Sequence, residues 1–373
     1  MRYRNYLILL LAVLFLVQCN TKKEPQSKSA IFEEFLSECY SKGVLNGSVL
    51  VAENGKIIYQ KAFGISGDNT NLSLDSQFRL ASVSKQVTAT TVMILKEEGK
   101  LSFDDPVTKY IPELPYDGIT IRHLLNHTSG LPDYVTLCEK KWRPDLKPDN
   151  RNRTIHGIEE ILKIIIENNP PKQFEPGEKY EYSNTGYVFL AIIVERISGM
   201  PFHKFMKENV FRKAGMKHTW LISPVREDPL KNRVRGYYMK DDKLILNDFH
   251  FLNSAQGDGE IFSTLGDLYK WDRALYTEDI ISQKTLNEAY TPGLLNNGKS
   301  TEYGFGVNVS KSKSGKTMIA HGGGWLGFRT WIGREIEDNN CIIILTNNST
   351  DKIGFLTEGL QNILHGKKYR KPS

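Results

Sequence analysis

The spacing of apolar residues changes twice along the chain, and each change predicts a different kind of secondary structure. Residues 31–40 carry apolar side chains at helical intervals, so we expect a helix there. Two apolar runs, 47–52 and 56–60, then flank the sequence Glu53-Asn54-Gly55. An Asn-Gly pair between apolar runs is the strongest short hairpin signal, so strands come first in the predicted fold.

The middle of the chain has a mostly helical pattern. Helices are predicted at 85–98, 121–126, 157–168, 184–198, 202–213 and 265–275. The connections between them are rich in Gly, Pro, Asn and Asp, which favour turns. After residue 303 strand patterns return at 305–310, 317–320, 328–333 and 341–346, followed by an amphipathic helix at 352–364.

Strands at both ends of a helical middle predict an α+β fold. We expect an antiparallel sheet built from the N- and C-terminal segments with flanking helices, plus a large, mainly helical insertion packed on one face. On this interpretation residues 31–366 form a single catalytic domain, in which 31–81 and 300–366 make the sheet region and 82–299 the helical region. A site would lie in the cleft between these two regions.

The composition is that of an ordinary globular protein, with 373 residues, 40% hydrophobic and 25% charged. The formal net charge of +6 is partly terminal, because the leader contains two arginines and residues 367–373 form a basic tail. No helix of the body carries a basic stripe, so a nucleic-acid partner is not expected. Apart from Cys19, three cysteines remain; they cannot all pair and lack metal-ligand spacing, which favours core packing over disulfides or a metal site.

Residues 1–18 have the layout of a secretory signal, with a cationic start and an apolar run. That run is shorter than the roughly 20 apolar residues that a membrane-spanning helix needs. It ends at Cys19 in a sequence similar to a bacterial lipoprotein box, although Gln18 stands where a small residue is usual. We therefore expect an exported lipoprotein of the cell envelope, joined to its membrane anchor by a polar tether over residues 19–30. Plain secretion, with Cys19 lost or incidental, is the alternative.

Near the C-terminus the sequence HGGGWLGF places Gly322, Gly324 and Gly327 on the G-x-G-x-x-G spacing of a dinucleotide-binding loop. That loop needs a helix after the glycines, whose N-terminus meets the pyrophosphate. Residues 328–333 instead read as a second strand, and no convincing acidic residue follows at the expected distance. The glycines therefore need another explanation.

Ser82 and Lys85 stand at the head of the first long predicted helix. A spacing of three residues puts hydroxyl and amine on one face, one turn apart, where the amine can take the hydroxyl proton. The pair alone is a weak signal, because Ser310 and Lys313 have the same spacing in what reads as a polar turn. A helix cap at Ser82 with an exposed Lys85 is the structural alternative.

Two further elements bear on this choice. Tyr182 and Asn184 lie on a loop just before an apolar helix, where a phenol can share proton transfer and an amide can orient a substrate and a lysine. Taken singly, Tyr182 could equally be a core aromatic. The third element is His321-Gly322-Gly323, at the end of a predicted strand.

The order Ser-x-x-Lys, Tyr-x-Asn, His-Gly-Gly resembles the serine β-lactamase-related superfamily, and most closely the branch with class C β-lactamases, D,D-carboxypeptidases, D-aminopeptidases and lipolytic esterases. Residues 123–132, 257–264 and 303–306 are also similar to this branch. The resemblance covers roughly residues 31–366.

The resemblance implies a role for each motif position. Ser82 would be the acylated nucleophile, Lys85 its proton partner and Tyr182 a general base. Asn184 would hold the substrate amide, and the backbone N–H groups of Ser82 and Gly324 would form the oxyanion hole. Gly322, Gly323 and Gly324 would keep the strand edge bare, so that a substrate backbone can lie along it. No metal or organic cofactor is implied.

His321 departs from many penicillin-recognising relatives, which carry Lys-Thr-Gly where this chain has His-Gly-Gly. The cation and hydroxyl that help hold a substrate carboxylate in those relatives are thus absent. Arg329 could supply a replacement cation, or be a surface residue on a strand. His127 and Asp133 invite a catalytic triad, but no G-x-S-x-G elbow is present, and a structural role for His127 fits better. The contribution of Glu260, in a glycine-rich turn, is left open.

These observations predict a serine hydrolase of the bacterial envelope that acts through an acyl-enzyme on Ser82. Its substrates would be esters or D-amino-acid amides and peptides, small molecules or peptides that include peptidoglycan-derived ones. A β-lactamase or penicillin-binding D,D-carboxypeptidase is the alternative within the family. A non-catalytic envelope lipoprotein that binds a ligand is the alternative of another class.

Overall fold

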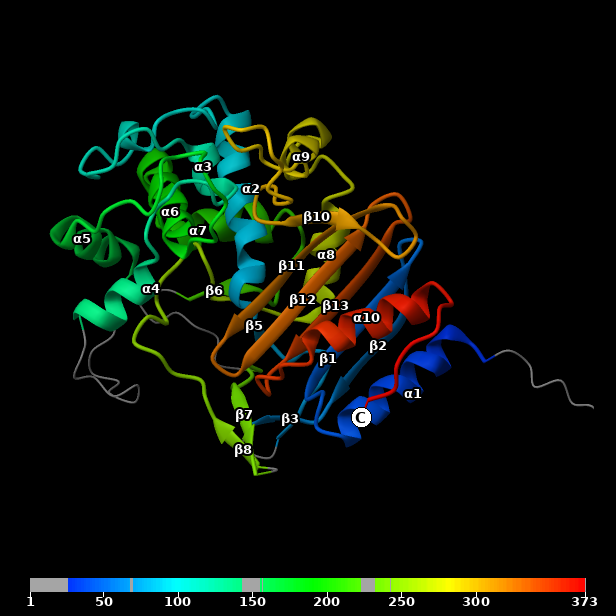
Figure 1. Cartoon of the computed structure of the whole chain (residues 1–373). Coiled ribbons are helices and arrows are strands. Elements are labelled where there is room, and N and C mark those ends of the chain that lie inside the picture. The colour runs from blue at the N-terminus through cyan, green and yellow to red at the C-terminus, as the bar shows by residue number, and fades with distance from the viewer. Residues whose placement is uncertain are drawn as a thin grey trace, which may run out of the picture.

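A six-stranded antiparallel sheet joins the two ends of the chain in a computed structural model, which describes residues 26–67, 70–142, 155, 157–222, 232–241 and 243–372 (Figure 1). The strand order is β10-β11-β12-β13-β1-β2, so that β13 lies between β12 and the N-terminal hairpin. The strands are β1 (Gly47–Glu53), β2 (Lys56–Phe63), β10 (Asn308–Lys311), β11 (Thr317–Trp325), β12 (Phe328–Glu335) and β13 (Asn340–Thr346). The predicted α+β fold is therefore confirmed.

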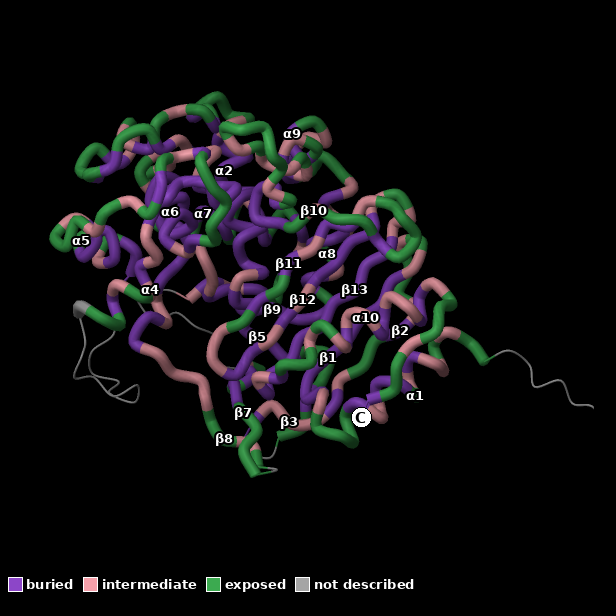
Figure 2. The backbone as a smooth tube through the Cα atoms, in the orientation of Figure 1, coloured by how far each residue is buried: buried purple, intermediate pink, exposed green. Residues whose placement is uncertain are grey.

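The first hairpin forms as its sequence predicts. Asn54 and Gly55 take φ values of 50° and 73°, the left-handed conformation that a two-residue hairpin turn requires. β1 then pairs with β13 from Gly47 opposite Thr346 to Ala52 opposite Cys341. All seven residues of β13 are buried, because both faces of the sheet are covered here (Figure 2).

Two helices from opposite ends of the chain cover one face of the sheet (Figure 1). They are α1 (Lys28–Ser41) and α10 (Ile353–Leu364), and they contact each other. Their apolar sides pack on alternate residues of the central strands to form one of the two core clusters, which includes Phe32, Phe35, Leu36, Val49, Val51, Ile342, Ile344 and Leu360. The other face is covered by α8 (Leu265–Ala274), which contacts β13 and β1.

The helical region packs around α2 (Ser84–Glu97), whose residues from Ser84 to Leu95 are all buried (Figure 2). α2 contacts α6 (Asn184–Ser198), and α6 is also buried along most of its length. The remaining helices are α3 (Ile121–Leu125), α4 (Tyr134–Leu137), α5 (Ile158–Asn168), α7 (Phe202–Met206) and α9 (Gln283–Ala289). Among the described residues no single helix is long and apolar enough to cross a membrane, although α6 together with 202–211, bent by 81°, passes by length and composition.

Several short strands lie outside the main sheet and were not predicted. A small three-stranded sheet is formed by β5 (Phe78–Arg79), β9 (Ile261–Ser263) and β6 (Trp220–Leu221), in that order. Its first strand, β5, ends three residues before Ser82 in the chain. Two-stranded sheets are formed by β3 (Ile65–Gly67) with β4 (Thr70–Asn71) and by β7 (Tyr237–Lys240) with β8 (Lys243–Leu246).

The structure differs from the predicted elements at several boundaries. The predicted tether reaches residue 30, but α1 begins at Lys28 because the Ser27 side chain caps it, accepting a hydrogen bond from Ala30 N. The strand predicted to end at residue 320 continues as β11 to Trp325, since its glycines pair with β12. The helix predicted over 202–213 ends at Met206 and continues as a π-type turn.

The predicted signal, Cys19 and most of the predicted tether lie outside the described residues, whereas the C-terminal tail is described up to residue 372. The basic tail folds back on α1 and α10, where Lys371 pairs with Glu34, Arg370 pairs with Glu358, and the Tyr369 ring lies against Phe35. The cysteines Cys39, Cys138 and Cys341 are buried and unpaired in the core.

The packing of α10 generates a stability prediction. Leu360 is fully buried between α10, α1 and the sheet, so Leu360→Ala removes apolar contacts and leaves a cavity. We expect a loss of about 2–4 kcal/mol in the free energy of unfolding, measured by urea denaturation. Gln361→Ala, one residue further and half-buried, is the matched control. Equal losses for the two variants would contradict the packing described for α10.

Candidate active site

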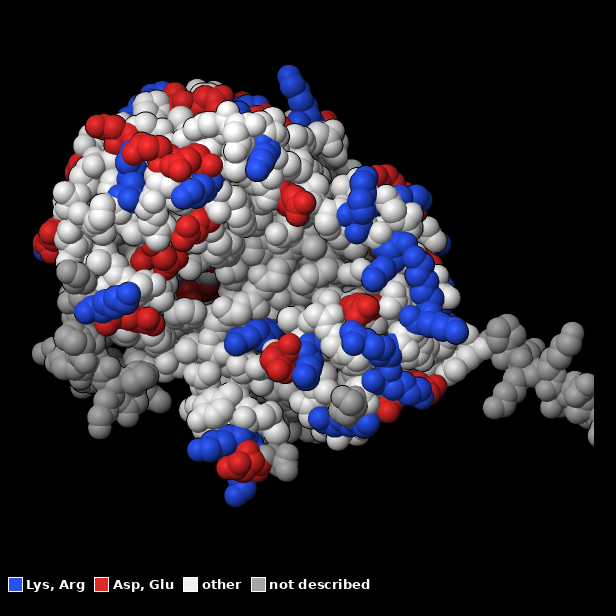
Figure 3. All heavy atoms as spheres, in the orientation of Figure 1, with Lys and Arg blue, Asp and Glu red and all other residues white. Residues whose placement is uncertain are grey.

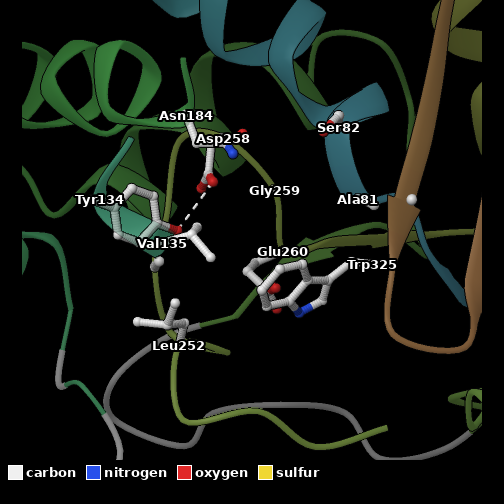
Figure 4. Close-up of a pocket in the computed structure, with 12 residues that line it drawn as sticks. Ala81, Ser82, Tyr134, Val135, Asn184, Leu252, Asp258, Gly259, Glu260 and Trp325 are labelled. Atoms are coloured by element: carbon white, nitrogen blue, oxygen red, sulfur yellow. Dashed lines mark hydrogen bonds between the residues drawn. The ribbon is translucent and has the colours of Figure 1, made fainter. Parts of the chain in front are cut away.

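Ser82 and Lys85 lie one helical turn apart, where a short 3₁₀ turn, Ala81–Val83, leads into α2. Figure 4 shows Ala81 and Ser82 of this turn. Ser82 is half-buried and lines a cleft, whereas Lys85 is fully buried. The Lys85 Nζ atom is 3.2 Å from Ser82 Oγ. Ala81, just before the serine, has a φ of 47°, a left-handed conformation that a non-glycine residue rarely adopts. Such backbone strain persists where surrounding contacts impose it, often at functional sites.

Three segments of the chain meet at the Lys85 amine. Besides Ser82 Oγ, Nζ donates to Asn184 Oδ1 and to the backbone oxygen of Asp258, both at 2.8 Å. These two oxygens can only accept hydrogen bonds. The structure therefore brings together Ser82, Lys85 and Asn184, as the sequence predicts, and adds the main chain of a residue that the sequence analysis did not single out.

Asp133 fixes the orientation of Asn184. One oxygen of its carboxylate, Oδ2, accepts from both the Asn184 backbone N–H, at 2.9 Å, and the side-chain Nδ2, at 3.0 Å. Its other oxygen accepts from Val135 N at 2.9 Å. With Nδ2 held by a carboxylate, the oxygen of the Asn184 amide must point toward Lys85. Asp133 thus acts on Lys85 through Asn184, and not through the histidine that sequence reasoning paired with it.

Tyr182 stacks beside Lys85 at the mouth of the site. Lys85 Nζ lies 4.8 Å from the centre of the Tyr182 ring, within cation–π range. The ring packs on buried His127, with centroids 4.2 Å apart. His127 accepts a hydrogen bond from Ser183 N at 3.2 Å, and burial, with a smaller contribution from Lys85, holds its pKa well below the usual range. His127 is therefore a neutral support for Tyr182, in keeping with the structural role expected for it.

His321 is buried on β11, and its Nε2 is 2.8 Å from the Tyr303 hydroxyl. Burial lowers the pKa of His321 to about 3, and the charge of Lys85 contributes. The imidazole is consequently neutral at physiological pH and carries no charge that could hold a substrate carboxylate.

Two glycines of β11, Gly322 and Gly323, differ in how closely other atoms approach them. A Cβ on Gly323 would lie 2.2 Å from the Leu80 backbone oxygen and 2.4 Å from Thr330 Oγ1, so this position must be glycine for β11 to approach the turn that carries Ser82. Thr330 Oγ1 also donates to Leu80 O, at 2.6 Å, which ties β12 to the same turn. Gly322 is exposed and would meet no atom closer than 3.8 Å.

The strand edge beside the glycines is open among the described residues. β10 pairs with β11 only as far as Asn308 opposite Ala320, whereas β12 pairs with β11 through Trp325. The stretch from His321 to Trp325 therefore has a partner strand on one side only. Because β12 and not a helix follows Gly327, the dinucleotide-loop interpretation is excluded.

Arg329 lies on the face of the sheet opposite Ser82. It stands directly across from Gly324, while the neighbouring pair Gly323 and Thr330 faces the turn before Ser82. Since successive residues of a strand point to opposite faces, the Arg329 side chain points away from the site. Its Nη1 donates to the backbone oxygens of Leu326 and Phe328. The strand register therefore supports Arg329 as a residue on the outer face of the sheet and not as a replacement cation in the site.

A cleft of about 400 Å³ opens in front of Ser82, between the helical region and β11 (Figure 4). Its lining combines apolar side chains, two carboxylates and, among the described residues, no lysine or arginine: Ala81, Ser82, Tyr134, Val135, Asn184, Leu252, Ala255, Asp258, Gly259, Glu260, Gly324 and Trp325. Figure 3 shows carboxylate atoms deep in the hollow on this side of the molecule.

The two carboxylates of the cleft are partnered differently. Glu260 lies against the buried Arg79, with 2.6 Å and 2.5 Å between Arg79 Nη1 and its two oxygens. Asp258 accepts a hydrogen bond from the neutral Tyr134 hydroxyl at 3.1 Å. Burial raises the pKa of Asp258 to about 6, opposed by Lys85 and reinforced by Asp133. Burial likewise raises the pKa of Glu260, and Arg79 opposes that shift.

Sequence reasoning missed the groups that complete the site. Asp258 lies on a loop and Tyr134 on the four-residue helix α4, where no periodic pattern marks them, and Trp325 ends β11 beyond the strand that was predicted. Asp133 was noted only as a possible partner of His127, whereas its contact is with Asn184. Only the fold shows that the turn at residues 257–259 reaches the start of α2. Among the described residues, no cluster of three or more His, Cys, Asp or Glu side chains could hold a metal ion.

Comparison with known proteins identifies similar chains. The family model described as Beta-lactamase matches residues 29–358. The chain is 35% identical to penicillin-binding protein 4* of Bacillus subtilis, over 93% of this chain and 78% of that protein. It is 27% identical to a D-aminopeptidase of Brucella anthropi, over 76% of this chain and 52% of that one. The structure of a D-amino acid amidase from Ochrobactrum anthropi SV3 superposes with a TM-score of 0.72 at 26% identity, covering 91% of this chain and 100% of the amidase.

The close approach at Gly323 generates a first prediction for the site. Gly323→Ala would push β11 away from the Leu80 carbonyl and shift the turn before Ser82, and a displacement of about 1 Å at a reacting group can cost about 10²-fold in rate. We expect a loss of that order in kcat/KM on a reactive ester. Gly354→Ala, at an exposed glycine of α10 whose Cβ would meet no atom within 4 Å, should change kcat/KM by no more than about threefold. Comparable losses in both variants, with both folded by circular dichroism, would refute this role of Gly323.

The contact between Asp133 and Asn184 generates a second prediction. Both oxygens of the Asp133 carboxylate accept hydrogen bonds from N–H groups. In Asp133→Asn one of these oxygens becomes an NH₂ group, which cannot accept, so the hold on the Asn184 amide weakens and its oxygen can turn away from Lys85. We expect kcat to fall by about 10²-fold with a smaller change in KM. Asp267→Asn is the control, because Asp267 is a buried carboxylate outside the cleft lining, and one of its oxygens likewise accepts two hydrogen bonds, from His218 N and Thr219 Oγ1. It should lower the melting temperature and leave kcat near the wild-type value; the same kcat loss in both would argue against a positioning role.

Proposed function

Since the chain belongs to the beta-lactamase family and is a serine hydrolase, we propose that it acts through an acyl-enzyme on Ser82, with esters or D-amino-acid amides and peptides as substrates. The observation that carries this proposal is the set of contacts at Lys85, whose amine reaches Ser82 Oγ and two acceptor oxygens.

The geometry at Lys85 supports a role as the base that activates Ser82. A neutral amine has two N–H donors and one lone pair. Asn184 Oδ1 and Asp258 O accept the two donors, which leaves the lone pair directed at the Ser82 hydroxyl proton. The serine oxygen then attacks the substrate carbonyl while its proton passes to Lys85.

Tyr182 and the backbone of β11 complete the proposed mechanism. Tyr182, in contact with Lys85, would relay the proton to the leaving group and later help to activate water for hydrolysis of the acyl-enzyme. The N–H groups of Ser82 and Gly324 belong to residues that line the same cleft, and would bind the oxyanion. The open edge from His321 to Trp325 offers backbone groups to a peptide-like substrate.

The charge pattern favours esters and D-amino-acid amides over penicillins. A penicillin carries a carboxylate, yet His321 is neutral, Arg329 faces the other side of the sheet, and the cleft lining contains carboxylates. The similar D-amino acid amidase and D-aminopeptidase support the amide and peptide part of this proposal.

The second candidate is a β-lactamase or a penicillin-binding D,D-carboxypeptidase. It is favoured by the 35% identity to a protein named penicillin-binding protein 4*. For either activity we propose the cell envelope as the place of action, with lipid attachment at Cys19, on the strength of the N-terminal sequence alone.

Ester turnover and intact mass together test the proposal. We expect the protein to hydrolyse a neutral 4-nitrophenyl ester, and Ser82→Ala to lower kcat/KM by at least about 10³-fold. Ser310→Ala is the matched control, since Ser310 has the same spacing to a lysine but lies exposed on β10. Mixing with a penicillin and recording the mass over time separates the candidates. A persistent adduct that depends on Ser82 would favour the penicillin-binding alternative, and one that forms and disappears a β-lactamase. Full ester activity in Ser82→Ala would overturn both.

A further inference from the structure

The cleft in front of Ser82 contains a half-buried carboxyl group, that of Asp258, which forms no ion pair among the described residues. Among these residues its side chain has one hydrogen bond, from the neutral Tyr134 hydroxyl. Glu260 differs, because Arg79 neutralises it. Withdrawal from water raises the pKa of Asp258 to about 6, although the charge of Lys85 opposes the shift.

Asp258 lies close to the proposed nucleophile. Its backbone oxygen contacts Lys85 Nζ, and Lys85 Nζ contacts Ser82 Oγ, so two hydrogen bonds separate this residue from the reacting atom. In Figure 4 its carboxyl group points into the space between Tyr134, Asn184 and Glu260. In an aminoacyl substrate the ammonium nitrogen is two covalent bonds from the carbonyl carbon. A group held at Asp258 can thus present a carbonyl carbon near Ser82.

The rest of the lining matches a cation with an apolar neighbour. Tyr134 and Trp325 contribute aromatic rings, which attract cations, while Val135, Leu252 and Ala255 contribute apolar surface. Trp325 is held in place by a hydrogen bond from its Nε1 to Asn253 Oδ1, at 2.9 Å. Nothing in the described lining offers a positive charge to a substrate carboxylate.

We propose that Asp258 is a specificity-determining residue that binds a substrate ammonium group, so that the preferred substrates are amides or peptides with a free amino group beside the scissile carbonyl. The aromatic rings of Tyr134 and Trp325 extend this ammonium subsite. The inference rests on the proposed function, but it concerns binding and can be measured apart from turnover.

The binding test uses the Ser82→Ala protein, which holds ligand without consuming it. D-alaninamide, which carries a free ammonium, and N-acetyl-D-alaninamide, which does not, are titrated by calorimetry. We expect the ammonium ligand to bind more tightly by about tenfold to a hundredfold, the strength of a charged hydrogen bond. Adding Asp258→Asn should remove most of that difference, and Asp258→Glu, which keeps the charge, should restore part of it.

Two comparisons keep the outcome specific. Glu181→Gln removes an exposed carboxylate that does not line the cleft, and should leave the ratio of the two affinities unchanged. The proposal is overturned if the acetylated ligand binds as well as the free amine, or if folded Asp258→Asn protein keeps the full preference. Loss of the proposed function would instead appear as absent Ser82-dependent ester turnover, whatever the two ligands do.

Discussion

The buried amine of Lys85 is the constraint around which the site is built. A lysine withdrawn from water needs partners for its nitrogen, and here they come from three distant parts of the chain. Each partner is itself fixed: Asn184 by Asp133, the 257–259 turn by its contacts with α2 and α6, and Ser82 by the strained turn at Ala81. Three segments of the helical region therefore meet at one nitrogen atom, and the cleft opens in front of the serine beside it.

The large features of the fold could be predicted because they leave a period in the sequence. The N-terminal hairpin, α2, α6 and the C-terminal strands each carry several turns or pairs of apolar residues. The short strands β5, β6 and β9 could not be found, since two or three residues carry no period. The end of β11 was missed for a different reason: glycines weaken a strand, and only cross-strand pairing with β12 keeps the chain extended there.

The candidate site divides in the same way. Ser82 and Lys85 stand one turn apart at the start of a long helix, so their spacing implies proximity. Asn184, at the start of another helix, was grouped with them only through the family resemblance, and the structure brings the three together. Tyr182 and His321 are placed beside Lys85 by tertiary packing with His127 and Tyr303. Asp133 and Asp258 could not be assigned from sequence, because their relation to Lys85 exists only once separate loops converge. The charge character of the cleft follows from those loops, so it too became visible only in three dimensions.

The order of strands in the main sheet has a consequence for how the protein is made. β1 is flanked by β2 and by β13, and β13 belongs to the last part of the chain. During synthesis the N-terminal hairpin has to wait for residues near the C-terminus before its second edge is covered, and such long-range pairing forms slowly. A chain that cannot close its sheet until β13 has been made has no finished catalytic domain before that point. The interleaved termini thus couple assembly of the hydrolase to the completion of its own synthesis.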